Sequence, residues 1–263
     1  MRNIKKILVP FDFSEASINA LDYTLNFVGY DQPIDVLVLE VTHSPSTATK
    51  EKESEEEFQK ILNTLNRRTK KNPMFLTVSG NLIETLLKTQ LEQQIDLTIM
   101  GTMGEGDSEE AMTNTSKLVL EANSPVISVP YGTEINTPKH IALVLGKEEI
   151  ERPKVLGVLL DVARTFNAKV HVLTIYKESI YGEKAVVETN ENTLEYYLEH
   201  FYDEHYFSKN QDIEQGILEY IDNKDIDLLA ILPRNHAQKT KPSEGRLTKL
   251  LTLHSTVPVL TLD

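Results

Sequence analysis

Short runs rich in valine, isoleucine and leucine alternate with longer stretches of helical periodicity along the whole chain. Near-continuous apolar runs indicate strands buried on both faces, and the helices between them indicate parallel strands joined by crossovers. The alternation therefore predicts an α/β fold with doubly wound parallel sheets. The expected strands are residues 5–10, 34–41, 74–80, 95–101 and 125–130, then 140–146, 169–176, 205–209, 226–232 and 258–263. The expected helices are 14–28, 50–71, 82–94 and 109–122, then 152–166, 190–201, 212–223 and 244–253.

The second half of the chain repeats the order of the first. The segment "IDLTIM" begins at Ile95 and "IDLLAI" at Ile226, an offset of 131, whereas Pro125 and Pro258 are offset by 133. The second copy is thus two residues longer between its fourth and fifth strands. A repeat of this length indicates a duplicated domain rather than a solenoid, whose units are shorter. We expect one domain over 1–131 and another over 139–263, with a linker over 132–138, each with a five-stranded sheet.

Composition excludes several classes of protein. The formal charge of -13 disfavours binding to nucleic acid or to an anionic membrane. The absence of cysteine excludes disulfides, thiolate metal sites and cysteine nucleophiles. No apolar stretch approaches the roughly 20 residues of a membrane span, so a cytoplasmic protein is expected.

Two loops lie where an open parallel sheet binds ligands, beyond the carboxyl ends of its strands. The first follows strand one and carries Asp12 in "ILVPFDFSEAS". The second is "GTMGEGDSEEAMTNTSK", in which Gly101 and Gly104 stand before a helix. Asp12 has two interpretations, a turn or helix-cap carboxylate or a ligand contact. The glycines likewise either bring amides to a phosphate or meet a need for unusual backbone angles.

These segments together resemble the universal stress protein family. "ILVPFDFSEAS" is similar to its opening strand and turn, and "VSGN", "DLTIMGTMG" and "NTSKLVLEANSPVISVP" are similar to its later signatures. The resemblance covers nearly the whole chain as two tandem copies. It implies five-stranded domains that pair through their last strands, here as an intramolecular pseudo-dimer, and it leaves a further homodimer open.

Some members of that family bind ATP, and the resemblance places the matching residues here. Asp12 would meet the adenine, Pro10 also matches, and Val41 ends strand two where a backbone contact is made. Gly101 and Gly104 match the first two glycines of the family's phosphate loop. The implied cofactor is ATP or AMP with Mg²⁺ in the first domain.

The end of that phosphate loop can be aligned with the family pattern in two ways. Counting forward from Gly104 places its last pair at Asn114 and Thr115, whereas counting back from Pro125 places it at Met112 and Thr113. The backward count in the second copy reaches Gly245, so the first copy is expected to lack two residues and the third glycine. Thr113 and Asn114 complete the set of candidate nucleotide ligands.

Charge also argues against this phosphate loop. It carries Glu105, Asp107, Glu109 and Glu110 where phosphates would lie. Like charges about 4 Å apart cost on the order of 1 kcal/mol in water, and only a bound Mg²⁺ would invert the local sign.

The second copy departs from the family pattern differently. Gly146 replaces the proline, Glu148 stands only roughly at the aspartate position, and the loop over 233–246 is basic without the two early glycines.

Other chemistry has little support in the sequence. "EHFYDEH" brings Glu199, His200, Glu204 and His205 together, but the histidines are five apart and so do not share a helical face. We therefore interpret the segment as a solvated helix end and expect no metal. Walker, G-x-S-x-G and H-E-x-x-H motifs are absent, which argues against an enzyme.

Two functions remain. The first is a regulatory or interaction role without turnover, exerted through protein partners of unknown identity, with a degenerate nucleotide site. The alternative is an adenine-nucleotide sensor that uses the first domain.

Overall fold

The computed structural model describes residues 4–30, 32–65, 69–103, 113–146, 150, 153–177, 184–232 and 246–262. They divide into two compact units. The first unit contains residues 4–136 and 252–256, and the second contains residues 137–251 and 257–262. The change between them at residues 136 and 137 falls inside the predicted linker.

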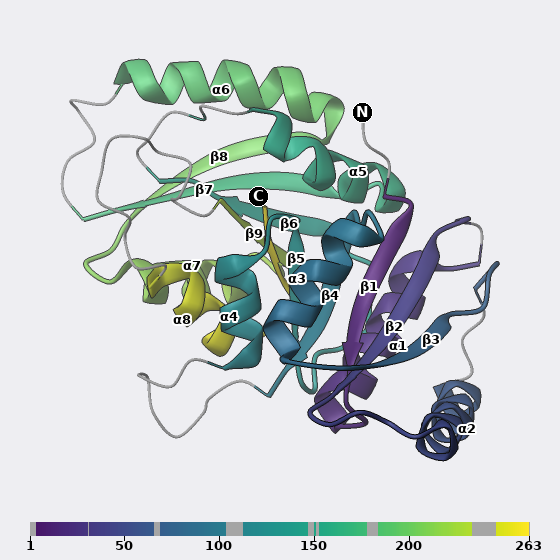
Figure 1. Ribbon diagram of the computed structural model, residues 1–263. Helices are drawn as coiled ribbons and strands as arrows, with labels where there is room; N and C mark the ends of the chain where they lie inside the picture. Colours follow the sequence, from purple (N-terminus) through teal and green to yellow (C-terminus); the bar gives the residue numbers. More distant parts are fainter. Residues whose placement is uncertain are drawn as a thin grey trace. The chain divides into compact units, whose positions relative to one another are not determined.

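The first unit is a parallel five-stranded sheet in the order β3-β2-β1-β4-β5 (Figure 1). Its strands are β1 (Lys6–Phe11), β2 (Asp35–Thr42), β3 (Met74–Ser79), β4 (Leu97–Thr102) and β5 (Val126–Pro130). Its helices are α1 (Glu15–Val28), α2 (Ala48–Leu65), α3 (Leu82–Glu92) and α4 (Asn114–Glu121).

The second unit has the same strand order, β8-β7-β6-β9-β10, and again every pair is parallel. Its strands are β6 (His140–Val144), β7 (Lys169–Tyr176), β8 (Tyr202–Lys209), β9 (Leu228–Ile231) and β10 (Val259–Thr261). Its helices are α5 (Leu156–Phe166), α6 (Lys184–Leu198), α7 (Ile213–Asn223) and, as far as residue 251, α8 (Arg246–His254). Its 3-10 turns are η1 (Pro153–Val155) and η2 (Glu199–Phe201). The predicted doubly wound α/β fold with its duplication is confirmed at the level of each unit.

The central strands of the first unit are covered on both faces. On one face, Leu8 of β1 and Leu37 of β2 pack in one core cluster with Leu86 of α3 and Leu118 of α4. On the other face, Phe11 contacts Phe58 of α2. Burial on both sides explains why the strands are continuous apolar runs instead of alternating ones.

The two-residue difference between the copies has a structural counterpart. Thr98 pairs with Val126 in the first unit, and Leu229 pairs with Val259 in the second, which reproduces the offsets of 131 and 133. Helices α4 and α8 end at Glu121 and His254, also 133 apart. The length difference therefore lies between the paired residues of strand β4 or β9 and the end of the helix that follows.

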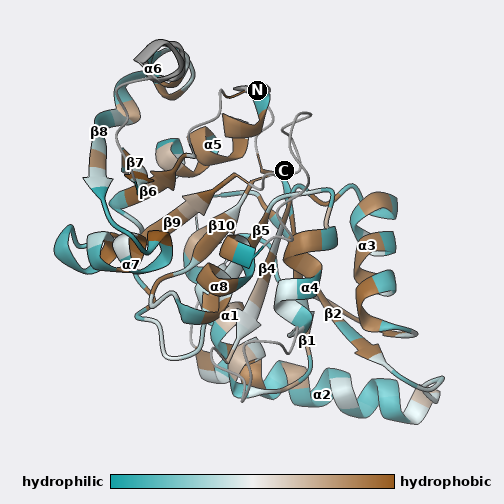
Figure 2. Ribbon diagram, turned by 90° about the vertical axis from the view of Figure 1, so that its left-hand side faces the viewer, coloured by the Kyte–Doolittle hydropathy of each residue, from teal (hydrophilic) through white to brown (hydrophobic). Residues whose placement is uncertain are grey.

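Helix α2 is attached to its unit by few side chains. Phe58 is the buried residue of this 18-residue helix, which is described throughout, and Figure 2 shows the helix as mostly hydrophilic. The Phe58 ring stacks on Phe75 of β3 at 4.7 Å between centroids. One aromatic side chain thus anchors five turns of helix.

One sequence interpretation is wrong in the second unit. The helix expected over 190–201 is α6 followed by η2, and β8 begins at Tyr202 and not at residue 205. Glu204 and His205 are therefore strand residues, not a helix end. Aromatic and β-compatible residues on both sides of this acidic stretch let it join the sheet edge.

Within the described part of the chain, no helix combines the length and the apolar character that crossing a membrane requires.

Candidate functional site

Asp12 lies in the turn that joins β1 to α1. Its Oδ1 accepts hydrogen bonds from the backbone N–H of Ser14 at 3.1 Å and from the Ser14 hydroxyl at 2.5 Å. Ser14 is in turn the N-cap of α1, accepting a bond from the Ser17 N–H at 3.2 Å. Asp12 therefore already has a structural role in the turn before the helix, and this role needs no ligand.

Phe13 holds this turn in place. Its backbone has a φ of 64°, a left-handed conformation that is uncommon for a bulky residue. Its ring packs edge-on against Phe11 at 5.0 Å and Phe75 at 6.1 Å between centroids. Aromatic packing compensates for the backbone strain and fixes where Asp12 points its carboxylate.

The carboxyl group of Asp12 is anionic at neutral pH. Its partial burial raises the pKa, but hydrogen bonds from Ser14 and Ser17 outweigh that effect and leave the pKa below the ordinary 3.8. A fixed anion at this position can accept bonds from N–H donors and repels other anions.

Pro10 and Val41 occupy the neighbouring strands. Pro10 is buried and lies beyond the last residues of β1 that pair with β4, Ile7 and Leu8. Strands β1 and β4 diverge there, which is the point where the strand order reverses and open α/β sheets bind ligands. Val41 pairs with Val78 of β3 and packs against the core, so its side chain has a structural role.

Gly101 is required by packing. A Cβ at this position would collide with the backbone carbonyl of Ala16 in the first turn of α1. Gly101 is not among the residues with positive φ, so the expectation of unusual backbone angles is wrong for this glycine. Gly104 and the acidic residues that follow it lie outside the described residues.

Thr113 is the N-cap of α4, and Asn114 is its first residue. The Thr113 hydroxyl accepts from the N–H of Ser116 at 3.1 Å. One residue on, the Thr115 hydroxyl donates to the carbonyl of Gly101 at 2.9 Å. The first turns of α1 and α4 thus both contact the end of β4 at Gly101, bringing two helix N-termini to the switch point.

Comparison with known proteins identifies the family. The model of the universal stress protein family matches residues 3–130, the segment that contains Asp12, Gly101 and Thr113. Through this match, the first unit of the chain belongs to the universal stress protein family. A comparison with curated protein sequences gives no significant match.

Two solved structures that cover nearly the whole chain agree with this assignment at the level of the fold. A universal stress protein from Archaeoglobus fulgidus DSM 4304 is 14% identical, with 97% of each chain covered and a TM-score of 0.69. A functionally unknown protein from Pseudomonas aeruginosa PAO1 is 14% identical, with 98% of this chain and 92% of that chain covered and a TM-score of 0.65. The Archaeoglobus fulgidus universal stress protein solved in complex with dAMP is 15% identical and covers 49% of this chain, with all of that chain covered and a TM-score of 0.36.

The corresponding positions of the second unit are only partly described. Gly146 follows β6 and is exposed, and Arg246 is exposed at the start of α8. Glu148 and the basic loop before Arg246 lie outside the described residues.

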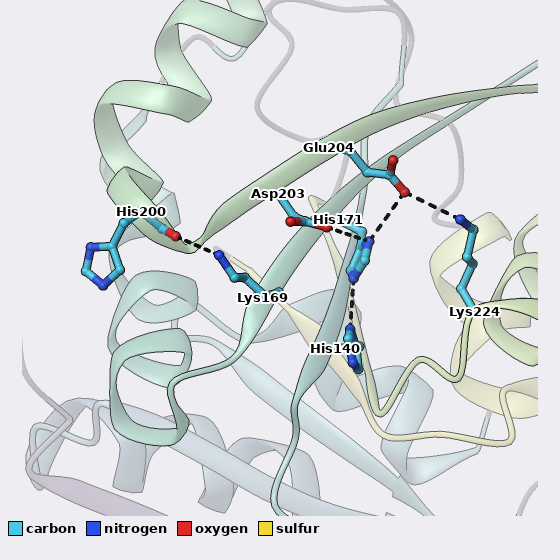
Figure 3. A network of polar contacts seen from close by, with 7 residues as sticks. All are labelled: His140, Lys169, His171, His200, Asp203, Glu204 and Lys224. Atoms are coloured by element: carbon cyan, nitrogen blue, oxygen red, sulfur yellow. Dashed lines mark hydrogen bonds and ion pairs between the residues drawn. The ribbon is translucent and has the colours of Figure 1, made fainter.

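A polar cluster elsewhere in the second unit was not predicted. His171 of β7 faces the side chains of Asp203 and Glu204 of β8, and its other ring nitrogen lies 3.0 Å from His140 (Figure 3). Burial lowers the pKa of His171, although Asp203 and Glu204 act in the opposite direction. Glu204 is part of the "EHFYDEH" segment considered above, but no spacing in the sequence joins residue 171 to residues 203 and 204, so this cluster could not be predicted.

Proposed function

We propose that this universal stress protein acts without turnover, as a regulatory protein that works through protein partners, and that the nucleotide site of its first unit is degenerate. The proposal rests on one observation, that the side chains of Asp12 and Thr113 already form hydrogen bonds within the protein. Oδ1 of Asp12 accepts two bonds from Ser14, and the Thr113 hydroxyl caps α4.

A nucleotide at these groups would compete with bonds that the protein already makes. Hydrogen bonds to a charged group contribute about 1.5–3 kcal/mol net, so replacing those of Asp12 leaves little gain from an adenine contact. The phosphate end is also unfavourable, because the chain has four acidic residues among positions 105–110 and a net charge of -13. Both ends of a nucleotide would therefore bind more weakly than at a site with free donors and acceptors.

The alternative is an adenine-nucleotide sensor that binds ATP or AMP, with Mg²⁺, in the first unit. One observation favours it: Asp12 is an exposed, fixed anion at the switch point, where the first turns of α1 and α4 meet Gly101. An anionic oxygen is a good acceptor for the amino group of adenine.

Calorimetric titration of nucleotide-stripped protein with ATP, ADP and AMP, with and without Mg²⁺, separates the two functions. Asp12→Asn removes the charge and keeps an acceptor for Ser14. Asp96→Asn is the matched control, because Asp96 accepts from the N–H groups of Lys5 and Lys6 at the opposite end of β1.

Absence of binding up to millimolar nucleotide is the result expected for the regulatory role. Micromolar binding that Asp12→Asn removes and Asp96→Asn leaves intact would overturn it in favour of the sensor. Phosphate release above the blank in the presence of Mg²⁺ would contradict the absence of turnover.

The pairing of the two copies with each other, any further homodimer and the cytoplasmic location stay predictions. Light scattering on the full chain tests the homodimer through the molar mass.

A further inference from the structure

An irregularity between two strands of the second unit brings three ligand-type side chains together. Val170 of β7 pairs with Tyr202 of β8, but Val172 pairs with His205, so the single residue His171 stands opposite both Asp203 and Glu204. This is a β-bulge, in which an extra residue re-aims side chains that would otherwise point to opposite faces of the sheet. The bulge therefore explains how two consecutive acidic residues face one histidine.

The distances within this cluster are short. Nδ1 of His171 lies 3.7 Å from Oδ2 of Asp203 and 3.8 Å from Oε1 of Glu204, and the three atoms all lie within 4.8 Å of one another. Figure 3 shows the two carboxylates on the same side of the imidazole ring, with His140 on the other side.

A second observation concerns the imidazole itself. His171 is 7% exposed, and among the described residues its Nδ1 atom, although buried, has no hydrogen-bond partner. Buried polar atoms are satisfied in the great majority of cases, so an unpartnered nitrogen directed at two carboxylates points to a missing ligand. Its other nitrogen, Nε2, lies 3.0 Å from Nδ1 of His140. His140 can thus orient the His171 ring, as the second hydrogen-bond partner of a metal-binding histidine commonly does.

We propose that His171, Asp203 and Glu204 bind a divalent first-row transition-metal ion, for which Zn²⁺ is the test ion. One imidazole and two carboxylates form a nitrogen and oxygen donor set that such ions accept. Ligand atoms around tetrahedral zinc lie about 3.4 Å apart, as follows from metal–ligand distances of about 2.0–2.2 Å. The observed separations of 3.7 and 3.8 Å need only a small contraction to reach this value.

Lys224 at the end of α7 competes for this position. Its Nζ lies 3.5 Å from the same Oε1 of Glu204 and 5.5 Å from the centre of the Tyr206 ring. Both Lys224 and Glu204 are about half exposed, so the ion pair is weak and the lysine can turn away.

The histidines that the sequence singled out are not part of this cluster. The backbone carbonyl of His200 accepts from Lys169 at 3.2 Å, while its ring points away from the carboxylates in Figure 3. His205 instead lies 2.9 Å from the Thr174 hydroxyl and 3.6 Å from Glu191. The three proposed ligands therefore come from β7 and the bulge, and neither of these histidines is needed.

The test is a calorimetric titration of the full chain, freed of metal by a chelator, with ZnCl₂. We expect one ion per chain, and we expect Asp203→Asn and Glu204→Gln each to weaken binding by at least about tenfold. Both substitutions are at half-exposed side chains, so the fold is retained, which circular dichroism checks. Lys224→Gln should tighten binding, because it removes the competing ammonium group. His200→Gln is the matched control for adventitious binding at a surface histidine and should change nothing.

Cobalt gives an independent spectroscopic readout. Co²⁺ bound to an imidazole and two carboxylates should give visible absorption bands that Asp203→Asn abolishes and His200→Gln preserves. The proposal is overturned if the Asp203→Asn/Glu204→Gln double variant binds Zn²⁺ as tightly as the unmodified chain. It is equally overturned if His200→Gln weakens binding as much as the carboxylate variants do.

Discussion

Gly101 and Ala16 are in such close contact that no side chain fits between them. A Cβ at residue 101 would lie 2.1 Å from the backbone carbonyl oxygen of Ala16 and 3.2 Å from the Ala16 methyl group. Helix α1 therefore rests directly on the end of β4, and this contact sets the distance between the turn that carries Asp12 and the start of α4.

Gly101→Ala should consequently destabilise the protein by about 2 kcal/mol or more, because the backbone of α1 must move to admit one methyl group. Gly157→Ala is the matched control. Gly157 lies in α5 with open space around its Cβ position, so that substitution should be neutral or stabilising by about 0.5–1 kcal/mol. Urea unfolding of both variants measures the free energies, and equal effects would contradict the packing role of Gly101.

Phe58→Ala should release helix α2 from the first unit. The ring is fully buried, contacts Phe11 at 5.7 Å and stacks on Phe75, so its loss is expected to cost about 3–5 kcal/mol. Hydrogen exchange should show lost protection along 48–65 with protection of α1 retained. Phe58→Leu keeps most of the apolar volume and should lose much less, and an equal loss of protection in all helices would contradict a local anchor.

The pKa of Asp12 predicts a specific pH dependence of stability. Because the folded state holds this pKa below the ordinary 3.8, the contribution of the charged form is fully present above that value. The contribution is lost as pH falls through the lower folded-state pKa. It is expected to stay under about 1 kcal/mol, because the group is exposed to solvent.

The measurement compares urea unfolding of the unmodified chain and Asp12→Asn from neutral to acidic pH. The difference in unfolding free energy should be constant near neutrality and shrink in acid. A difference that grows in acid would contradict the assigned direction of the pKa shift.

Zinc should stabilise the chain if His171, Asp203 and Glu204 bind it. At a free concentration one hundred times the dissociation constant, a ligand that binds only the folded state adds about 2.7 kcal/mol. The unfolding midpoint should rise with Zn²⁺ and return on addition of a chelator. The Asp203→Asn/Glu204→Gln double variant should show no rise, and Mg²⁺, which prefers six oxygen ligands, should have little effect on the unmodified chain.

Some features were predictable from the sequence because they depend on neighbours along the chain. Strand β7 was predicted with its observed bounds, and the helix expected over 14–28 is α1, which has Ser14 as its N-cap and ends at Val28. The offsets of 131 and 133 between the copies recur in the structure, in the residue pairs that join β4 to β5 and β9 to β10. Hydrophobic period, capping and chain length are local quantities that one sequence contains in full.

Other features were decided by packing between segments far apart in the chain. Whether Gly101 serves backbone conformation or close approach depends on where α1 lies, and the sequence cannot place a helix to a fraction of an ångström. Asp203 and Glu204 face His171 only because β8 bulges against β7, and a single sequence does not state which residue of one strand opposes which residue of another. The sequence by itself determined the duplicated α/β fold and the turn that holds Asp12. The tertiary structure alone decided which polar side chains meet, because strand register and helix approach are set by the packing of the whole unit.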